Sequence, residues 1–219
     1  MPYKKTKENM KGKLITFEGI DYSGKTTQAK RLFNYLKRKG YKILLLREPG
    51  GEKVSEKIRQ VLLSSRNTGM NPLTELLLYE AARAQLVSRV ILPALRQGKL
   101  VICDRFYDST LAYQGYGRSL DIKMIEYLNR VSVSGLKPDL TLLIDIPLNF
   151  FSKRMRRNNK KKDRIEKEKM DFYKRVRKGY LKIARKEKKR FKVIDGSGEI
   201  EAVWREVKKS VDSLLGNRS

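Results

Sequence analysis

Short apolar segments alternate with longer helical patterns along almost the whole chain of 219 residues. Five candidate strands are nearly continuous aliphatic runs, at 14–18, 42–47, 100–103, 140–146 and 190–194. Apolar residues recur with helical spacing over 25–39, 54–64, 72–97, 122–134, 148–188 (which a break can interrupt) and 200–215. Strands that are apolar on both faces, each followed by a helix, predict a parallel sheet covered by helices on both sides, an α/β fold.

Nothing in the sequence divides it into separate domains. No internal repeat, low-complexity linker or shift of composition interrupts the alternation. We therefore predict one domain over residues 13–216, preceded by a basic extension at 1–12. A chain of this length can bury enough apolar surface for a stable core.

Composition excludes several kinds of chemistry. The chain has no histidine, which rules out His-based nucleophile pairs and imidazole proton transfer. Its single cysteine, Cys103, rules out an internal disulfide, and the apolar run before it indicates a core residue. No apolar stretch reaches the ~18 residues of a membrane-spanning helix, and the basic N-terminus lacks the apolar segment of a secretory signal. We expect a cytoplasmic protein with no membrane partner.

The segment after the first predicted strand is glycine-rich and comprises Gly19, Ile20, Asp21, Tyr22, Ser23, Gly24, Lys25, Thr26 and Thr27. It fits the phosphate-binding pattern G-x-x-x-x-G-K-[ST] and lies between a strand and a helix, as that pattern requires. Its glycines let backbone N–H groups turn toward an anion at the positive end of a helix. Lys25 can neutralise β- and γ-phosphate charge, and the Thr26 hydroxyl can ligate Mg²⁺. These residues predict a nucleotide site with Mg²⁺.

The third predicted strand leads into a second acidic position of interest. Asp104 follows the run 100–103 and is itself followed by Arg105, an arrangement in which a carboxylate orients Mg²⁺ or its waters. The fourth strand also ends in an acid, Asp145, but no arginine accompanies it, which favours a structural role. A phosphate-binding loop alone leaves ATPases, GTPases and kinases open.

Three further segments indicate which of these reaction classes applies. They are REPGG at 47–51, YEAARAQ at 79–85 and DRFYDSTLAYQG at 104–115. With the glycine-rich loop, and in this order, they closely resemble the thymidylate (dTMP) kinases, and the resemblance runs from about residue 14 to the C-terminal helix. DRIE at 163–166, DFY at 171–173 and DGS at 195–197 extend it.

The resemblance implies both an activity and an architecture. The activity is ATP- and Mg²⁺-dependent phosphorylation of dTMP to dTDP, for the supply of DNA precursors. The architecture is the P-loop NTPase fold, a five-stranded parallel sheet flanked by helices, with a basic helical lid at about residues 150–166. The family also implies a homodimer through the long helices of the second and third crossovers.

The resemblance assigns two groups of acceptor-site residues, the first around the phosphate. Arg47 and Arg105 would hold the acceptor's phosphate, and Arg105 would also reach the transferred phosphoryl group. Arginine suits both positions because its guanidinium is a fixed fork of donors. Asp21 would lie between the loop and the acceptor, near the sugar 3′-hydroxyl or the water shell of the metal.

The second group would recognise the nucleoside. Tyr79 would stack on thymine, at a position where family members commonly carry Phe. Arg83 and Gln114 would read the polar edge of the base. Tyr113 would crowd the 2′ side of the sugar and so favour deoxyribose.

One departure concerns the catalytic arginine. Some members of the family carry Arg in the phosphate-binding loop, at the position that is Tyr22 here. The other branch supplies an arginine from the lid, where this chain has Arg154, Arg156, Arg157 and Arg164. An arginine that arrives on lid closure would stabilise the charge of the transferred phosphoryl group. Our hypothesis is that Arg154 or Arg157 has this role.

The charge of the chain exceeds what this mechanism needs. Its net charge is +27, and residues 151–192 hold 21 Lys/Arg against 5 Asp/Glu. A solvated helix face in a heat-adapted protein, a nucleic-acid-binding arm and a phosphate-facing lid would each explain such a block. Association with polyanions is therefore open. So are two rival functions, a kinase of another nucleoside monophosphate and a nucleic-acid-associated ATPase.

Overall fold

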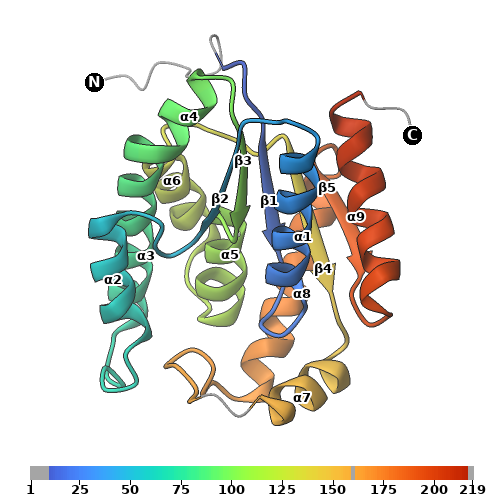
Figure 1. Cartoon of the computed structure of the whole chain (residues 1–219). Coiled ribbons are helices and arrows are strands. Elements are labelled where there is room, and N and C mark those ends of the chain that lie inside the picture. Colours follow the sequence, from blue (N-terminus) through green and yellow to red (C-terminus); the bar gives the residue numbers. More distant parts are fainter. Residues whose placement is uncertain (1–9, 159–160, 217–219) are drawn as a thin grey trace.

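A five-stranded parallel sheet forms the centre of the molecule (Figure 1). The computed structural model describes residues 10–158 and 161–216. The strand order is β2-β3-β1-β4-β5, with β1 at Leu14–Glu18, β2 at Ile43–Arg47, β3 at Leu100–Asp104, β4 at Leu140–Asp145 and β5 at Phe191–Asp195. All five predicted strands are confirmed within a residue or two, and so is the α/β class.

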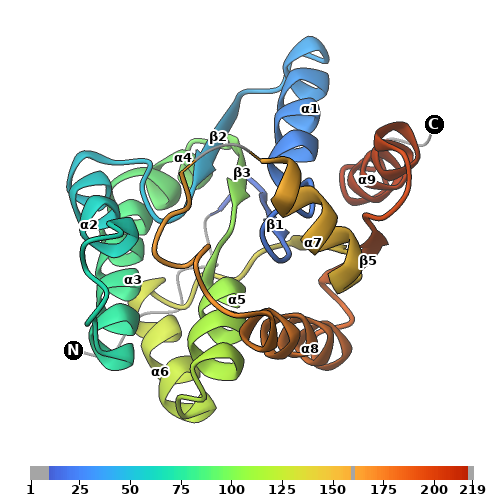
Figure 2. The same ribbon diagram turned by 90° about the horizontal axis from the view of Figure 1, so that it is seen from below.

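Helices cover both faces of the sheet. One face carries α1 (Lys25–Arg38) and α9 (Ile200–Leu214), whose apolar side chains pack on β1, β3 and β4. The other face carries α3 (Pro72–Leu86), η2 (Val87–Ile91), α4 (Leu92–Arg96), α5 (Tyr107–Thr110), η3 (Leu111–Gly117), α6 (Ile122–Ser132) and α8 (Met170–Lys186). Helix α2 (Lys53–Leu63) packs on α3, and α7 (Leu148–Arg157) lies beyond the carboxyl ends of the strands (Figures 1 and 2).

The helices differ from the sequence prediction in two places. The pattern over 148–188 is two helices, α7 and α8, and the described residues between them, 158 and 161–169, form no regular helix. The segment 107–117, which we had not predicted as helical, forms α5 and the π-helical η3. Its glycines hid it from a pattern search, but they have a packing reason, because a Cβ on Gly117 would lie 2.6 Å from Phe172 of α8.

The core confirms one more prediction and leaves another open. Cys103 is fully buried among apolar neighbours, and burial raises the pKa of its thiol. We predicted an extension at 1–12, of which residues 1–9 lie outside the described part of the chain. Within the described part, the Gly12 amide donates a hydrogen bond to Leu95 O at 3.0 Å. Within the described part of the chain, none of the helices is long and apolar enough to cross a bilayer.

The register of the strands brings the predicted functional residues to one edge. Arg47 at the end of β2 is paired with Asp104 at the end of β3, and Phe17 of β1 is paired with the same Asp104. The segments that follow these strands therefore start side by side. This edge is the one at which open α/β sheets bind ligands.

Candidate nucleotide and acceptor site

The glycine-rich loop leaves β1 and turns directly into α1. Gly19 has φ 140° and Gly24, the N-cap of α1, has φ 96°. A side chain at Gly19 would also place its Cβ 2.4 Å from Ile144 O, so only glycine fits there. No side chain of the described residues caps the N-terminus of α1. The first N–H groups of the helix are therefore available for an anion.

Lys25 lies inside this loop. Its Nζ is 3.4 Å from Ile20 O and 3.8 Å from the Asp21 carboxylate, and the side chain is 8% exposed. Burial lowers the pKa of Lys25, and the neighbouring Arg105 lowers it further. A phosphate group at the loop would supply the negative charge that this buried ammonium lacks.

Oxygen ligands for a divalent cation lie at the junction of the loop and β3. Thr26 Oγ1 donates a hydrogen bond to Asp104 Oδ2, while Asp104 Oδ1 is buried and has no hydrogen-bond partner in the described structure. The described residues contain no cluster of three His, Cys, Asp or Glu side chains that could enclose a metal. One carboxylate and one hydroxyl fit Mg²⁺, which takes most of its ligands from phosphates and water.

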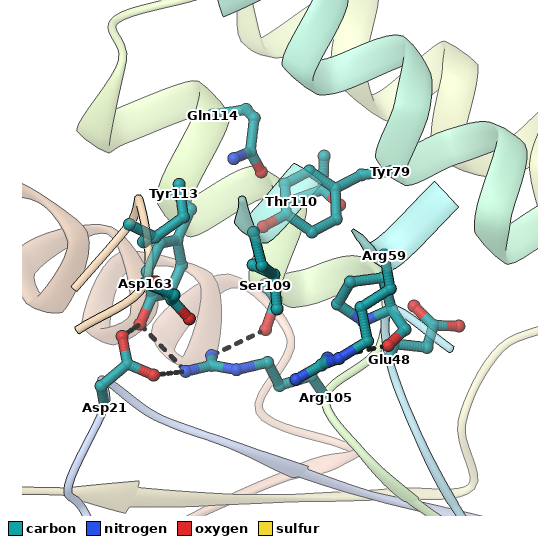
Figure 3. A pocket seen from close by; sticks show the side chains of 13 residues that line it. Asp21, Glu48, Arg59, Tyr79, Arg105, Ser109, Thr110, Tyr113, Gln114 and Asp163 are labelled. Atoms are coloured by element: carbon teal, nitrogen blue, oxygen red, sulfur yellow. Dashed lines mark hydrogen bonds and ion pairs between the residues drawn. The ribbon is translucent and has the colours of Figure 1, made fainter. Parts of the chain in front are cut away.

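Arg105 connects the loop to the region beyond β3. Its backbone has φ 70°, unusual for a residue with a side chain, and its guanidinium donates to Gly19 O at 3.0 Å and to Tyr113 Oη at 3.0 Å. It also pairs with the Asp21 carboxylate (Figure 3). Burial would raise the pKa of Asp21, but Arg105 and Lys25 hold it below its usual value. Asp21 is therefore a carboxylate at neutral pH.

The buried carboxyl group of Glu18 is linked to Arg105 through the Ser109 hydroxyl. Glu18, the last residue of β1, accepts from Phe106 N at 2.7 Å, Ser109 Oγ at 2.6 Å and Tyr180 Oη at 2.9 Å. Ser109 Oγ in turn accepts from Arg105 Nη1 at 3.2 Å. Burial, with a contribution from Asp108, raises the pKa of Glu18 to about 7.

A cavity of about 110 Å³ opens next to Arg105. Figure 3 shows carboxylates, guanidinium groups and phenol rings pointing into it from different elements. Its lining consists of Asp21, Glu48, Pro49, Arg59, Leu63, Tyr79, Arg105, Ser109, Thr110, Tyr113, Gln114, Asp163 and Ile165. A space with aromatic walls and charged groups at one end suits a planar base that carries a phosphate.

The basic segment after β4 lies over this site (Figure 2). Arg154 of α7 donates to the loop carbonyls Tyr22 O at 3.1 Å and Ser23 O at 3.2 Å, and to Gly196 O at 2.8 Å. Tyr22 Oη donates to Glu166 Oε1 at 2.9 Å. Arg157 is exposed and makes no hydrogen bond or ion pair among the described residues.

The comparisons with known proteins agree with this geometry. The family model for thymidylate kinase matches residues 17–207. The chain belongs to the thymidylate kinase family. The thymidylate kinase of Pelotomaculum thermopropionicum is 50% identical over 206 residues, which are 94% of this chain and 95% of that protein. That of Caldanaerobacter subterraneus is 49% identical over 206 residues, 94% of this chain and 98% of that protein.

A solved structure shows the same relationship in three dimensions. The crystal structure of thymidylate kinase from Ehrlichia chaffeensis is 39% identical, with a TM-score of 0.74. The match covers 91% of this chain and 98% of that one. The family assignment and the P-loop architecture expected from the sequence are both confirmed.

Five of the seven acceptor residues expected in a thymidylate kinase line the cavity. They are Asp21, Tyr79, Arg105, Tyr113 and Gln114. They come from three separate parts of the chain, the phosphate-binding loop, α3 and the segment after β3. In Figure 3 the Tyr79 ring and the Gln114 amide lie on the side of the cavity away from Asp21.

The other two expected residues lie outside the lining. Arg83 is 2% exposed, and its guanidinium pairs with Glu48 Oε2 and Glu80 Oε1, both at 2.7 Å. Arg47 is half-exposed and donates to both carboxylate oxygens of Glu56 at 3.1 Å. In this structure Arg83 therefore reaches the cavity only through Glu48.

Some lining residues had no role in the sequence prediction. Glu48 stands inside the quoted REPGG segment, and its Oε1 is buried without a hydrogen-bond partner in the described chain. Arg59 of α2 donates to Pro49 O at 2.9 Å. No motif marks Arg59. The only signal in the sequence is that Arg59 lies three residues after Glu56, on the same face of a helix. Both side chains contact the REPGG segment, Glu56 at the Gly51 amide and Arg59 at Pro49 O.

Proposed function

We propose that this thymidylate kinase transfers the γ-phosphoryl group of ATP to dTMP with the residues described above. The observation that carries the proposal is the position of Arg105. One guanidinium contacts Gly19 O of the phosphate-binding loop and also Tyr113 Oη of the cavity wall, each at 3.0 Å. A donor phosphate on the loop and an acceptor phosphate in the cavity would thus meet at one cation.

On the donor side, the roles follow from charge and position. Residues 19–27 would wrap the phosphates of ATP, with the N–H groups of α1 and the Lys25 ammonium as donors. Thr26 and Asp104 would hold Mg²⁺, partly through water. When bound, the cation neutralises phosphate charge as the phosphoryl group moves. No covalent intermediate on the protein is needed.

On the acceptor side, Tyr79 would stack on the thymine ring and Tyr113 would crowd the 2′ position of the sugar. Gln114 Nε2 donates to Glu75 Oε1 at 2.7 Å, and a carboxylate can only accept. The Gln114 amide is thereby fixed with its oxygen as the group left to accept from N3–H of the base. Arg83 would assist through Glu48, which lines the cavity and whose Oε1 has no hydrogen-bond partner among the described residues.

Arg47 and Arg105 would bind the acceptor's phosphate. Arg47 is engaged by Glu56, as is the Gly51 amide at 2.7 Å, so this loop is set before the acceptor arrives. Asp21 would accept from the sugar 3′-hydroxyl or from water around the metal. Its pKa below the usual value keeps it an acceptor at physiological pH.

A homodimer formed through α2, α3 and α6 belongs to the same proposal. Val54 and Val61 of α2 and Leu73 and Leu77 of α3 are each between 43% and 48% exposed, and Tyr127 of α6 is 59% exposed. Apolar side chains gathered on neighbouring helices favour contact with a second copy.

We expect the enzyme to act in the cytoplasm. Association with polyanions stays a prediction.

The experiment is a panel of acceptors. ADP release from Mg·ATP would be measured with dTMP, dUMP, dGMP, dCMP, UMP and duplex DNA, one at a time. Strong stimulation by dTMP, weaker by dUMP and little by UMP is the expected result. Equal stimulation by several bases would overturn the role of Gln114, and stimulation by DNA alone would overturn the acceptor site.

A further inference from the structure

A second, larger cavity lies on the far side of α5 and η3 from the acceptor site. Its volume is about 410 Å³, within the range of roughly 300–1,000 Å³ that small-molecule sites occupy. It is enclosed by α5, η3, α6, the segment before β4 and the C-terminal half of α8. Apolar side chains form much of its wall, among them Tyr107, Leu111, Tyr116, Val133 and Ile183. None of the acceptor or nucleotide residues proposed above lines it.

Each carboxylate of this cavity has a basic partner. Arg190 pairs with both oxygens of Asp108, at 2.7 and 2.8 Å, and with Glu187 at 3.2 Å. Lys186 pairs with Glu126 at 2.8 Å. These three are the carboxylates that line the cavity. Five Lys and Arg side chains line the cavity against these three carboxylates, so the lining has a formal charge of +2.

The other three cations of the lining do not pair with these carboxylates. Arg130, Lys137 and Lys182 have no carboxylate within ion-pair distance among the described residues. Arg130 lies 5.9 Å from the ring of Tyr127, and Lys182 lies 5.4 Å from that of Tyr116. An apolar interior with surplus positive charge complements a molecule that has an apolar body and an anionic group.

The wall between the two cavities is a single helical segment. Consecutive residues of α5 face opposite ways, since Tyr107 and Asp108 line the large cavity while Ser109 and Thr110 line the acceptor cavity. Figure 2 shows α5 between α6 and α8. Ser109 Oγ accepts from Arg105, so a shift of α5 would move a contact of the residue at the reaction centre.

We propose that the large cavity binds a small amphipathic anion and that its occupancy changes dTMP affinity across α5 and η3. The apolar body lies against the Tyr107 and Tyr116 side, and a carboxylate, sulfonate or phosphate group lies near Arg130 and Lys182. The coupling rests on the proposed acceptor site, whereas the binding site stands without it. Coupling is reciprocal, so dTMP also changes the affinity of the anion.

Binding is tested with 8-anilinonaphthalene-1-sulfonate, an aromatic anion whose fluorescence rises in apolar surroundings. Titrations are made with excess dTMP and Mg·ADP, which keep the probe out of the catalytic site. The double variant Arg130→Gln/Lys182→Gln removes two cations from the cavity. The control Lys123→Gln/Lys178→Gln removes two exposed cations from the same helices, one or two turns away and outside the lining.

We expect the cavity variant to bind the probe about tenfold more weakly than the wild type, because two charge contacts with the anionic group are lost. The control variant retains wild-type affinity, and the uncharged analogue N-phenyl-1-naphthylamine binds both variants equally. Equal affinity of the sulfonate for the two double variants would overturn the site.

Coupling is read separately, as the KM for dTMP at increasing probe concentration. A shift of about threefold or more is expected in the wild type and the control, and the cavity variant should need about tenfold more probe for the same shift. Probe binding without any shift would overturn the coupling and leave the site. Absence of dTMP turnover in every protein would overturn the proposed function, while the fluorescence titration would still report on the cavity.

Discussion

At the scale of single residues, the clearest consequence of burial is at Glu48. One arginine, Arg83, lies between the carboxylates of Glu48 and Glu80, and burial raises the pKa of Glu48 from 4.5 to about 7. Between these values the folded chain holds a proton that the unfolded chain has lost, so the free energy of unfolding falls as pH rises through this window. The free energy of unfolding of the wild type should therefore be higher at pH 5 than at pH 8. Glu48→Gln should reduce that difference by roughly 2 kcal/mol, measured by urea unfolding at the two pH values. Part of the pH dependence should survive through Glu18, whose pKa is shifted in the same direction. An exposed substitution, Glu206→Gln, serves as control, and an unaltered slope in Glu48→Gln would contradict the assignment.

At the scale of elements, α7 contacts the phosphate-binding loop through one of its three last-turn arginines. Arg154 holds the carbonyls of Tyr22 and Ser23, whereas Arg157 is exposed and has no such contact within the described chain. We expect Arg157→Ala to lower kcat by about 10²–10³ with little change in ATP affinity, since it would reach only the transferred phosphoryl group. Arg154→Ala should weaken ATP binding as well, because the loop loses its anchor. Arg156→Ala, exposed on the same turn, is the matched control in steady-state kinetics with Mg·ATP and dTMP. Wild-type kcat in Arg157→Ala would remove that residue from the mechanism.

At the scale of the whole molecule, the apolar face of α2 and α3 is the surface that we propose as the dimer interface. Leu77 is 48% exposed on that face, and a charge there would be buried without a partner in a dimer. Leu77→Glu is therefore expected to convert a dimer to a monomer in sedimentation velocity at micromolar concentration. Ile200, at the start of α9, is 56% exposed and lies outside this face. Ile200→Glu is therefore the matched control, and it should keep the wild-type sedimentation coefficient. Dimeric Leu77→Glu, or a monomeric wild type, would contradict this interface.

Much of the fold follows from the sequence because its signals are local. Five aliphatic runs and the helical spacing between them predicted strands and helices whose ends differ from the structure by a residue or two, except over 148–188, where the structure has two helices. The phosphate-binding loop is nine consecutive residues whose order alone requires the turn from β1 into α1. The segment 107–117 failed the same search because its glycines serve contacts with α6 and α8, and a contact between separate segments leaves no period in the sequence.

The sequence by itself determined the sheet and the phosphate-binding loop, and it named five of the residues that line the candidate acceptor cavity. Only the tertiary structure decided how those residues are partnered. Arg83 lies behind Glu48, 35 positions away in the chain, and Arg154 docks on Tyr22 across 132 positions. Such partners are chosen by burial, because a charge removed from water binds whichever opposite charge or carbonyl the packing brings to it. That choice depends on the assembled core, which no single stretch of sequence contains.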